Sequence, residues 1–157
     1  MTIKGAPKEQ IFKVKKSTKI AVITANWNAE ITQQMKSESI KVLEEHGLKP
    51  VSIEVSGSFE LISATKNAFD KKFDAVVALG VVVKGDTPHF DYVCMGVTNG
   101  IAQIAAVTGK PIGFGVLTCD TEKQAHERAG FSDSIENKGR DSALAVLQSL
   151  MSHKKLG

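Results

Sequence analysis

A short polar segment, Lys84-Gly-Asp-Thr-Pro-His89, follows the most apolar stretch of the chain. Thr87 suits a helix N-cap, and Pro88 suits the first helical position, where its missing N–H would be unpaired in any case. Backbone amides around Asp86 and Thr87 would then lie at the positive end of a helix dipole, which favours a bound anion. Lys84 adds positive charge, whereas the Asp86 carboxylate must point away. The segment predicts a site for phosphate or a similar anion.

His89 would lie in the first turn of that helix, at the mouth of the anion site. A helix N-terminus favours the neutral imidazole, which is the form that a general base requires. Histidine at a helix start is also common as a surface residue, so the residues alone leave both roles open. The other histidines lack this context: His46 precedes Gly47 at an expected helix end, and His126 and His153 are expected on the surface.

Other kinds of chemistry have weaker support in the sequence. Gly113-Phe-Gly115 lacks the third glycine of a dinucleotide fingerprint and lies within an expected strand, and neither a P-loop nor a GxSxG nucleophile elbow is present. Cys94 and Cys119 lie far apart, without a CxxC or His-Cys grouping, which argues against a disulfide framework or a zinc site. We therefore expect two reduced thiols and no bound metal.

Continuous apolar runs alternate with longer segments of helical period, which is typical of an α/β domain. Solid apolar runs favour strands buried on both faces of a parallel sheet, and the short connections imply right-handed crossovers. We expect a three-layer α/β/α fold with a doubly wound, parallel, four-stranded sheet of the flavodoxin-like kind. Strands are expected at 19–25, 51–55, 75–83 and 111–117, and helices at 29–46, 59–72, 88–108, 122–129 and 138–153.

Such a fold directs attention to four loops, because ligands of open α/β sheets bind beyond the carboxyl ends of the strands. These loops are residues 26–28, 56–58, 84–87 and 118–120. The third loop contains the anion segment, so the other three are candidates for the rest of the site.

The bulk properties are those of an ordinary globular protein of 157 residues, without a linker, repeat or low-complexity tract. We expect one domain over residues 1–157, with residues 1–18 as an N-terminal arm. The net charge of +3 is small and most of the excess lies in that arm, so no nucleic-acid partner is expected. No apolar run approaches a membrane span and no signal peptide is recognisable, which predicts a cytoplasmic protein without membrane contact.

Residues Gln10–Lys16 alternate in part between apolar and polar side chains, as in a half-exposed strand. A strand that precedes the first core strand must pair somewhere, and a neighbouring subunit is one candidate.

Four segments match a known pattern in order and spacing: Asp74-Ala-Val-Val-Ala-Leu-Gly80 with 84–91, Gly57-Ser-Phe-Glu-Leu61, Gly115-Val-Leu-Thr118 with 124–125 and 127–130, and Asn137-Lys-Gly139. Each piece alone is weakly specific. Together they resemble the lumazine synthases from about Lys19 to the C-terminal helix, which is most of the chain.

The resemblance implies a role for each matching residue, with His89 as the proton-transfer group. It places Trp27 against a pyrimidine ring, Ser58, Phe59 and Glu60 at a ribityl chain, Val82 and Val83 at the pyrimidine, Lys84, Asp86, Thr87 and Arg128 around a phosphate, and Phe114 and Lys138 in the pocket of an adjacent subunit. Arginine suits the phosphate because its planar guanidinium meets phosphate oxygens in pairs.

The implied reaction condenses 5-amino-6-ribitylamino-uracil with 3,4-dihydroxy-2-butanone 4-phosphate and yields 6,7-dimethyl-8-ribityllumazine. The steps are Schiff-base formation, phosphate elimination and ring closure, which need orientation and proton transfer. No cofactor or metal is expected. Because an adjacent subunit completes the pocket, the resemblance also implies an obligate homo-oligomer.

The chain departs from the family pattern at a few positions. Ser56 stands where proline is frequent, Lys84 stands where arginine is common, and Cys94–Asn99 lacks an Asn-Glu pair that many members carry. The connection between Gly130 and Asn137 is longer than in capsid-forming members. That length favours a homopentamer over a sixty-subunit capsid.

Three alternative functions remain open at this point. A catalytically weak homologue would bind riboflavin or a lumazine in the same pocket, although the presence of His89, Arg128 and Glu60 argues against lost activity. An unrelated flavodoxin-like flavoprotein would copurify with FMN. A structural shell protein would assemble but show no activity.

Overall fold

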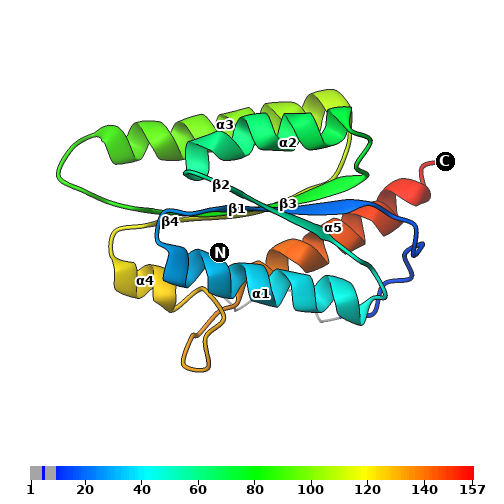
Figure 1. Ribbon diagram of the computed structural model, residues 1–157, viewed down its shortest axis with the longest axis horizontal. Coiled ribbons are helices and arrows are strands. Elements are labelled where there is room, and N and C mark those ends of the chain that lie inside the picture. Colours follow the sequence, from blue (N-terminus) through cyan, green and yellow to red (C-terminus); the bar gives the residue numbers. More distant parts are fainter. Residues whose placement is uncertain (1–4, 6–9) are drawn as a thin grey trace.

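A parallel sheet with helices on both faces forms the centre of the chain (Figure 1). The structure is a computed structural model that describes Gly5 and residues 10–157. The four strands lie in the order β2-β1-β3-β4, and each neighbouring pair is parallel. They are β1 (Ile20–Ala25), β2 (Val51–Val55), β3 (Ala75–Val83) and β4 (Ile112–Cys119).

The helices form one layer on each face of the sheet. In Figure 1, α2 (Leu61–Asp70) and α3 (His89–Thr108) lie on one side, and α1 (Ala29–Glu45), α4 (Glu122–His126) and α5 (Lys138–Lys154) lie on the other. A short 3-10 turn, η1 (Ser58–Glu60), precedes α2. The predicted three-layer, doubly wound α/β/α fold with a parallel four-stranded sheet is confirmed.

β1 is buried along its length and β3 along most of its length, because helices cover both of their faces. Their side chains alternate between two cores. Val22 and Leu79 belong to a core that includes residues of α1 and α5, whereas Ile23 belongs to a core with α2 and α3. The two central strands therefore give firm support to the loops that follow their carboxyl ends.

β2 corrects the expectation that the strands are buried on both faces. It lies at the edge of the sheet and pairs only with β1 within the described part of the chain. Val51 and Ile53 are 47% and 41% exposed. The single chain thus presents an open, partly apolar sheet edge.

Residues 10–16 form no strand within the described chain. Phe12 and Val14 pack partly against the core beside α1 and α5, while Ile11 is 90% exposed. The predicted pairing of this segment with a neighbouring subunit stays a prediction. Residues 1–4 and 6–9 of the predicted arm lie outside the described residues.

Helix and strand boundaries differ from the predictions for local reasons. The helix expected at 59–72 starts as η1, and the helix expected at 122–129 ends at His126, because Ala129 forms an antiparallel bridge with Asn137. β4 continues to Cys119, which is the register partner of Val83. No helix in the described part of the chain is long and apolar enough to cross a membrane.

Candidate active site

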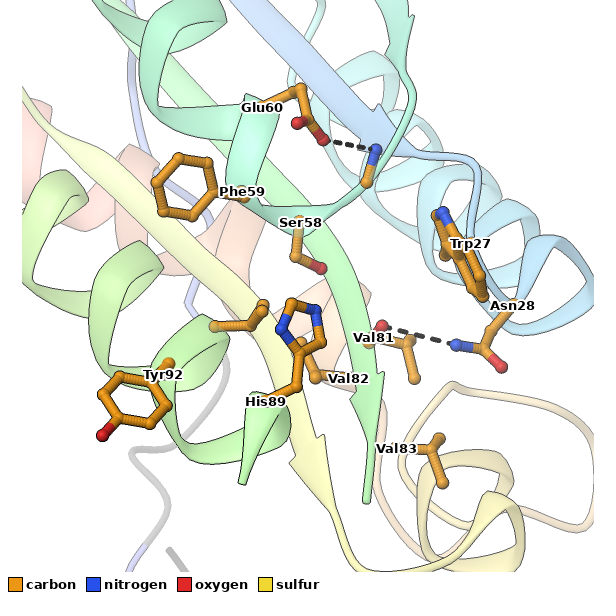
Figure 2. Close-up of a pocket in the computed structure, with 12 residues that line it drawn as sticks. Trp27, Asn28, Ser58, Phe59, Glu60, Val81, Val82, Val83, His89 and Tyr92 are labelled. Atoms are coloured by element: carbon orange, nitrogen blue, oxygen red, sulfur yellow. Dashed lines mark hydrogen bonds between the residues drawn. The ribbon is translucent and has the colours of Figure 1, made fainter. Parts of the chain in front are cut away.

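A cavity of about 690 Å³ opens at the carboxyl ends of the strands (Figure 2). The loop after β1, the η1 turn after β2, the end of β3 and the first turn of α3 enclose it. This is the location at which open α/β sheets bind ligands. Its walls are formed by Trp27, Asn28, Gly57, Ser58, Phe59, Glu60, Val81, Val82, Val83, His89, Tyr92 and Val93.

Trp27 forms an open apolar wall of this cavity and is 70% exposed. Asn28, the next residue, adopts the left-handed conformation with a φ of 57°. Its Nδ2 donates a hydrogen bond of 3.4 Å to the carbonyl oxygen of Val81, which ties the loop to β3 (Figure 2). An indole held in this way, with a free face, suits stacking on a planar heteroaromatic ring.

The turn at residues 57–60 supplies polar groups. The Gly57 amide donates a hydrogen bond of 2.9 Å to Glu60 Oε2, which fixes the carboxylate at the turn. Ser58 Oγ is buried and has no hydrogen-bond partner among the described residues. Gly80 leaves room for Ser58, because a Cβ at position 80 would collide with the hydroxyl. A hydroxyl and a carboxylate on one turn can bind a polyhydroxyl chain.

His89 is the first residue of α3 and lines the cavity. Its amide donates a hydrogen bond of 3.4 Å to Thr87 Oγ1. The predicted start of the helix is wrong by one position: Pro88, not Thr87, is the N-cap, and His89, not Pro88, is the first helical residue. Figure 2 shows the imidazole pointing into the pocket from the side opposite the η1 turn. Ser58 and Val82 are near it in this view.

The predicted anion segment borders the cavity without lining it. Lys84, Asp86 and Thr87 are part of the loop between β3 and α3. Within the described chain, the amides of Asp86 and Thr87 donate to no protein acceptor. Lys84 Nζ lies 3.8 Å from Asp120 Oδ1, and its amide donates to the carbonyl oxygen of Cys119. Free amides before a twenty-residue helix are suited to bind an anion.

Phe114, Arg128 and Lys138 lie in a second hollow of about 300 Å³, against β4 and the connection between α4 and α5. The structure thus groups Arg128 with Phe114 and Lys138, not with the residues of the first cavity. The second hollow is lined by Phe114, Gly115, Val116, Leu117, Thr118, Cys119, Gln124, Arg128, Glu136 and Lys138.

The polypeptide backbone fixes the relative positions of Arg128 and Lys138. The Lys138 amide donates a hydrogen bond of 2.9 Å to the Arg128 carbonyl oxygen. The guanidinium of Arg128 donates from Nη1 to the carbonyl oxygen of Gln124 over 2.8 Å. Two cationic side chains therefore share one wall of the second hollow.

Sequence reasoning missed several residues that the structure places at these sites. Asn28 was not predicted as a site residue, because its role depends on a left-handed backbone and on a contact with β3, which is distant in sequence. Tyr92 follows His89 by three residues, and helical spacing could have found it because such residues share a face. Glu136 lies in the second hollow, and its burial has no signal in the sequence.

The cysteines do not form part of a reactive centre. Burial raises the pKa of the Cys119 thiol, and burial followed by the charge of Asp91 raises the pKa of Cys94. Both thiols therefore stay protonated near neutral pH and are poor nucleophiles. In the part of the chain that the structure describes, no group of His, Cys, Asp or Glu side chains is arranged to hold a metal ion.

Comparison with known proteins identifies the family of the chain. Residues 17–154 match the 6,7-dimethyl-8-ribityllumazine synthase family. A protein of that name from Streptomyces coelicolor is 45% identical over 148 residues, covering 94% of this chain and 91% of the relative. One from Frankia casuarinae is 46% identical over 145 residues, covering 91% and 89%. The chain therefore belongs to the 6,7-dimethyl-8-ribityllumazine synthase family.

Proposed function

We propose that this protein is a lumazine synthase that acts in riboflavin biosynthesis and uses the cavity around Trp27 and His89. It condenses 5-amino-6-ribitylamino-uracil with 3,4-dihydroxy-2-butanone 4-phosphate. The products are 6,7-dimethyl-8-ribityllumazine, inorganic phosphate and two molecules of water. The proposal rests on the family match and on one observation: an open indole, a fixed carboxylate and a histidine line a single cavity beside free helix-terminal amides.

The pyrimidine of the first substrate stacks on Trp27 and contacts the backbone of Val82 and Val83 at the end of β3. Its ribityl chain extends toward Ser58, Phe59 and Glu60. Glu60 Oε2 already accepts from Gly57, so Oε1 is left for a ribityl hydroxyl. The unpartnered hydroxyl of Ser58 supports the same placement.

The phosphate of the second substrate binds to the amides of Asp86 and Thr87, with Lys84 nearby. These amides and the N-terminus of α3 favour the doubly charged phosphate that leaves during elimination. His89 is adjacent to both the cavity and this loop. It removes and returns protons during elimination and ring closure, a role for which imidazole is suited near neutral pH.

Two substrates held together in this way react faster chiefly because their reacting atoms are already in place. The amine condenses with the ketone and releases water. The phosphate then leaves, and the second nitrogen closes the ring with loss of the other water. No residue of the chain needs to form a covalent intermediate.

Phe114, Arg128 and Lys138 complete the site of an adjacent subunit. The separation of the two hollows within one chain supports this arrangement. We propose a cytoplasmic homopentamer rather than a sixty-subunit capsid, in which residues 10–16 extend the sheet of a neighbour. The open edge at β2 is the place where such a strand would pair.

The test is a two-substrate assay with purified protein. Lumazine fluorescence and phosphate release are followed together, with each substrate alone as a control. Both signals should rise in equal amounts when both substrates are present. A folded, oligomeric protein that yields neither signal would exclude the synthase function and favour a binding or structural role.

A further inference from the structure

Glu136 is a buried carboxylate in the second hollow, and none of the roles described above uses it. Its side chain is 8% exposed. Among the described residues, no donor is aligned to form a hydrogen bond with Oε2. A buried charge is costly unless an opposite charge compensates it, so the identity of its partner matters.

The compensating charge is the ammonium group of Lys138. Its Nζ lies 2.8 Å from Glu136 Oε2 and 3.2 Å from Asp141 Oδ2. Burial lowers the pKa of Lys138, but Glu136 and Asp141 together outweigh this effect and raise the pKa above its ordinary value. The Asp141 side chain is 55% exposed, so its ion pair is the more strongly screened of the two.

The backbone holds Glu136 in a fixed relation to Arg128. The amides of Ile135 and Glu136 donate to the Glu127 carbonyl oxygen over 2.9 Å and 3.0 Å, and the Lys138 amide donates to Arg128. The carboxylate therefore does not follow the movements of a free loop.

We propose that Glu136 is a positioning residue that holds the Lys138 ammonium group in the hollow beside Arg128. A neighbouring subunit then receives a preformed cationic wall. Without Glu136, the long lysine side chain would sample many rotamers, and ordering it would consume part of the binding energy of the substrate. This inference rests on the proposed function, since it assumes that the second hollow completes a neighbour's site.

Glu136→Gln tests the proposal, with Asp141→Asn as the matched control. Glu136→Gln is expected to raise KM for the butanone phosphate about tenfold while kcat changes by less than about twofold. Asp141→Asn should change KM by about twofold or less. In a Lys138→Met background, Glu136→Gln should have no further effect, because the two residues act as one unit.

A second readout does not depend on enzyme activity. Trace acetylation of Lys138, quantified by peptide mass spectrometry from about pH 8 to about pH 11, follows loss of its proton. Glu136→Gln should shift this profile to lower pH relative to wild type and to Asp141→Asn. Circular dichroism and light scattering establish that each variant is folded and assembled.

The outcomes separate the two proposals. An unchanged acetylation profile and an unchanged KM in folded Glu136→Gln protein would overturn the positioning role. Absence of product from wild type would instead remove the synthase function, and the acetylation profile would still decide whether Glu136 controls Lys138. An effect of Glu136→Gln that persists in full in the Lys138→Met background would assign it to general loosening of the connection.

Discussion

His89 stands between two parts of the site that have different tasks. The amides of Asp86 and Thr87 precede it in the chain, and the cavity with its open indole lies on its other side. In the proposed reaction, a group at this junction would reach both the leaving phosphate and the carbon skeleton that loses or gains protons.

Replacing His89 by alanine is expected to lower kcat about 10²-fold, the lower end of the range for general acid–base groups, because orientation remains intact. KM should change little. The measurement is the initial rate of lumazine formation under saturating substrate. His153→Ala is the matched control, since His153 is exposed near the end of α5, and its rate should equal that of wild type. Equal rates for His89→Ala and wild type would remove His89 from proton transfer.

At the residue scale, the sequence predicted most of the first cavity but little of its geometry. The start of α3, and with it the position of His89, could be predicted to within one residue, because helix termini follow local rules. The bond from Asn28 to Val81 could not, because it joins residues that only the fold brings together. The grouping of Arg128 with Lys138 was also not predictable, because it depends on a backbone hydrogen bond across the connection from α4 to α5.

At the element scale, α1 and α5 approach closely at a glycine. Ser39 Oγ donates a hydrogen bond of 2.6 Å to the Gly139 carbonyl oxygen, and both groups are buried. A Cβ at position 139 would collide with the backbone of Met35. The start of α5, and with it Lys138, is therefore placed by contact with α1.

Gly139→Ala should destabilise the protein by about 1–3 kcal/mol, because the helices must separate to admit a methyl group. The measurement is urea unfolding followed by circular dichroism at a fixed subunit concentration. Gly85→Ala is the matched control: a Cβ there would meet nothing within 4 Å, so stability should be unchanged. Equal stability of Gly139→Ala and wild type would show that α1 and α5 can separate at little cost.

The contact between α1 and the edge strand should depend on pH. Hydrogen bonds from Lys36 and then from Gln33, together with the charge of Lys36, lower the pKa of Glu54 on β2. A carboxylate whose pKa is lower in the folded than in the unfolded protein stabilises the fold at pH values above its unfolded pKa of about 4.3. This contribution to stability is lost as the pH falls through the pKa of the folded state.

Unfolding midpoints of wild type and Glu54→Gln measured between about pH 6 and about pH 3 should therefore converge as the solution becomes more acidic. The difference at neutral pH should be small, because the group is exposed. Glu44→Gln, at an exposed position on α1, is the matched control. A constant offset between wild type and Glu54→Gln would contradict the assignment.

The elements themselves were predictable where periodicity was strong. β3 and α3 follow from an uninterrupted apolar run and a capped helix, and their limits agree with prediction to within a residue. The exposure of β2 was not predictable, because which strand becomes the edge depends on strand order. The shortened α4 reflects a bridge from Ala129 to Asn137 that has no local signal.

At the scale of the whole molecule, the proposal that the second hollow completes a neighbour's site requires two chains for one active site. Mixing subunits tests this directly. His89→Ala and Lys138→Met homo-oligomers should each have a strongly lowered, but measurable, kcat/KM. After denaturation and refolding as an equal mixture, about one quarter of the sites would combine an intact His89 with an intact Lys138, so about one quarter of wild-type activity should return.

Unmixed samples refolded in the same way provide the control, and light scattering should give the mass of five chains, not sixty. Failure of the mixture to regain activity would place His89 and Lys138 in the same site of one chain. A mass near sixty chains would retain the shared site but overturn the pentamer.

The open edge at β2 also has a consequence for newly made chains. Before assembly, Val51 and Ile53 lie beside unpaired backbone groups, a combination that invites pairing with the wrong partner. Glu54 interrupts the apolar pattern, and Lys36 lies 2.9 Å from its carboxylate. The charge of Glu54 on this edge strand thus opposes aggregation of unassembled chains. Loss of this charge should increase aggregation most when the protein is expressed at high concentration and its subunits assemble slowly.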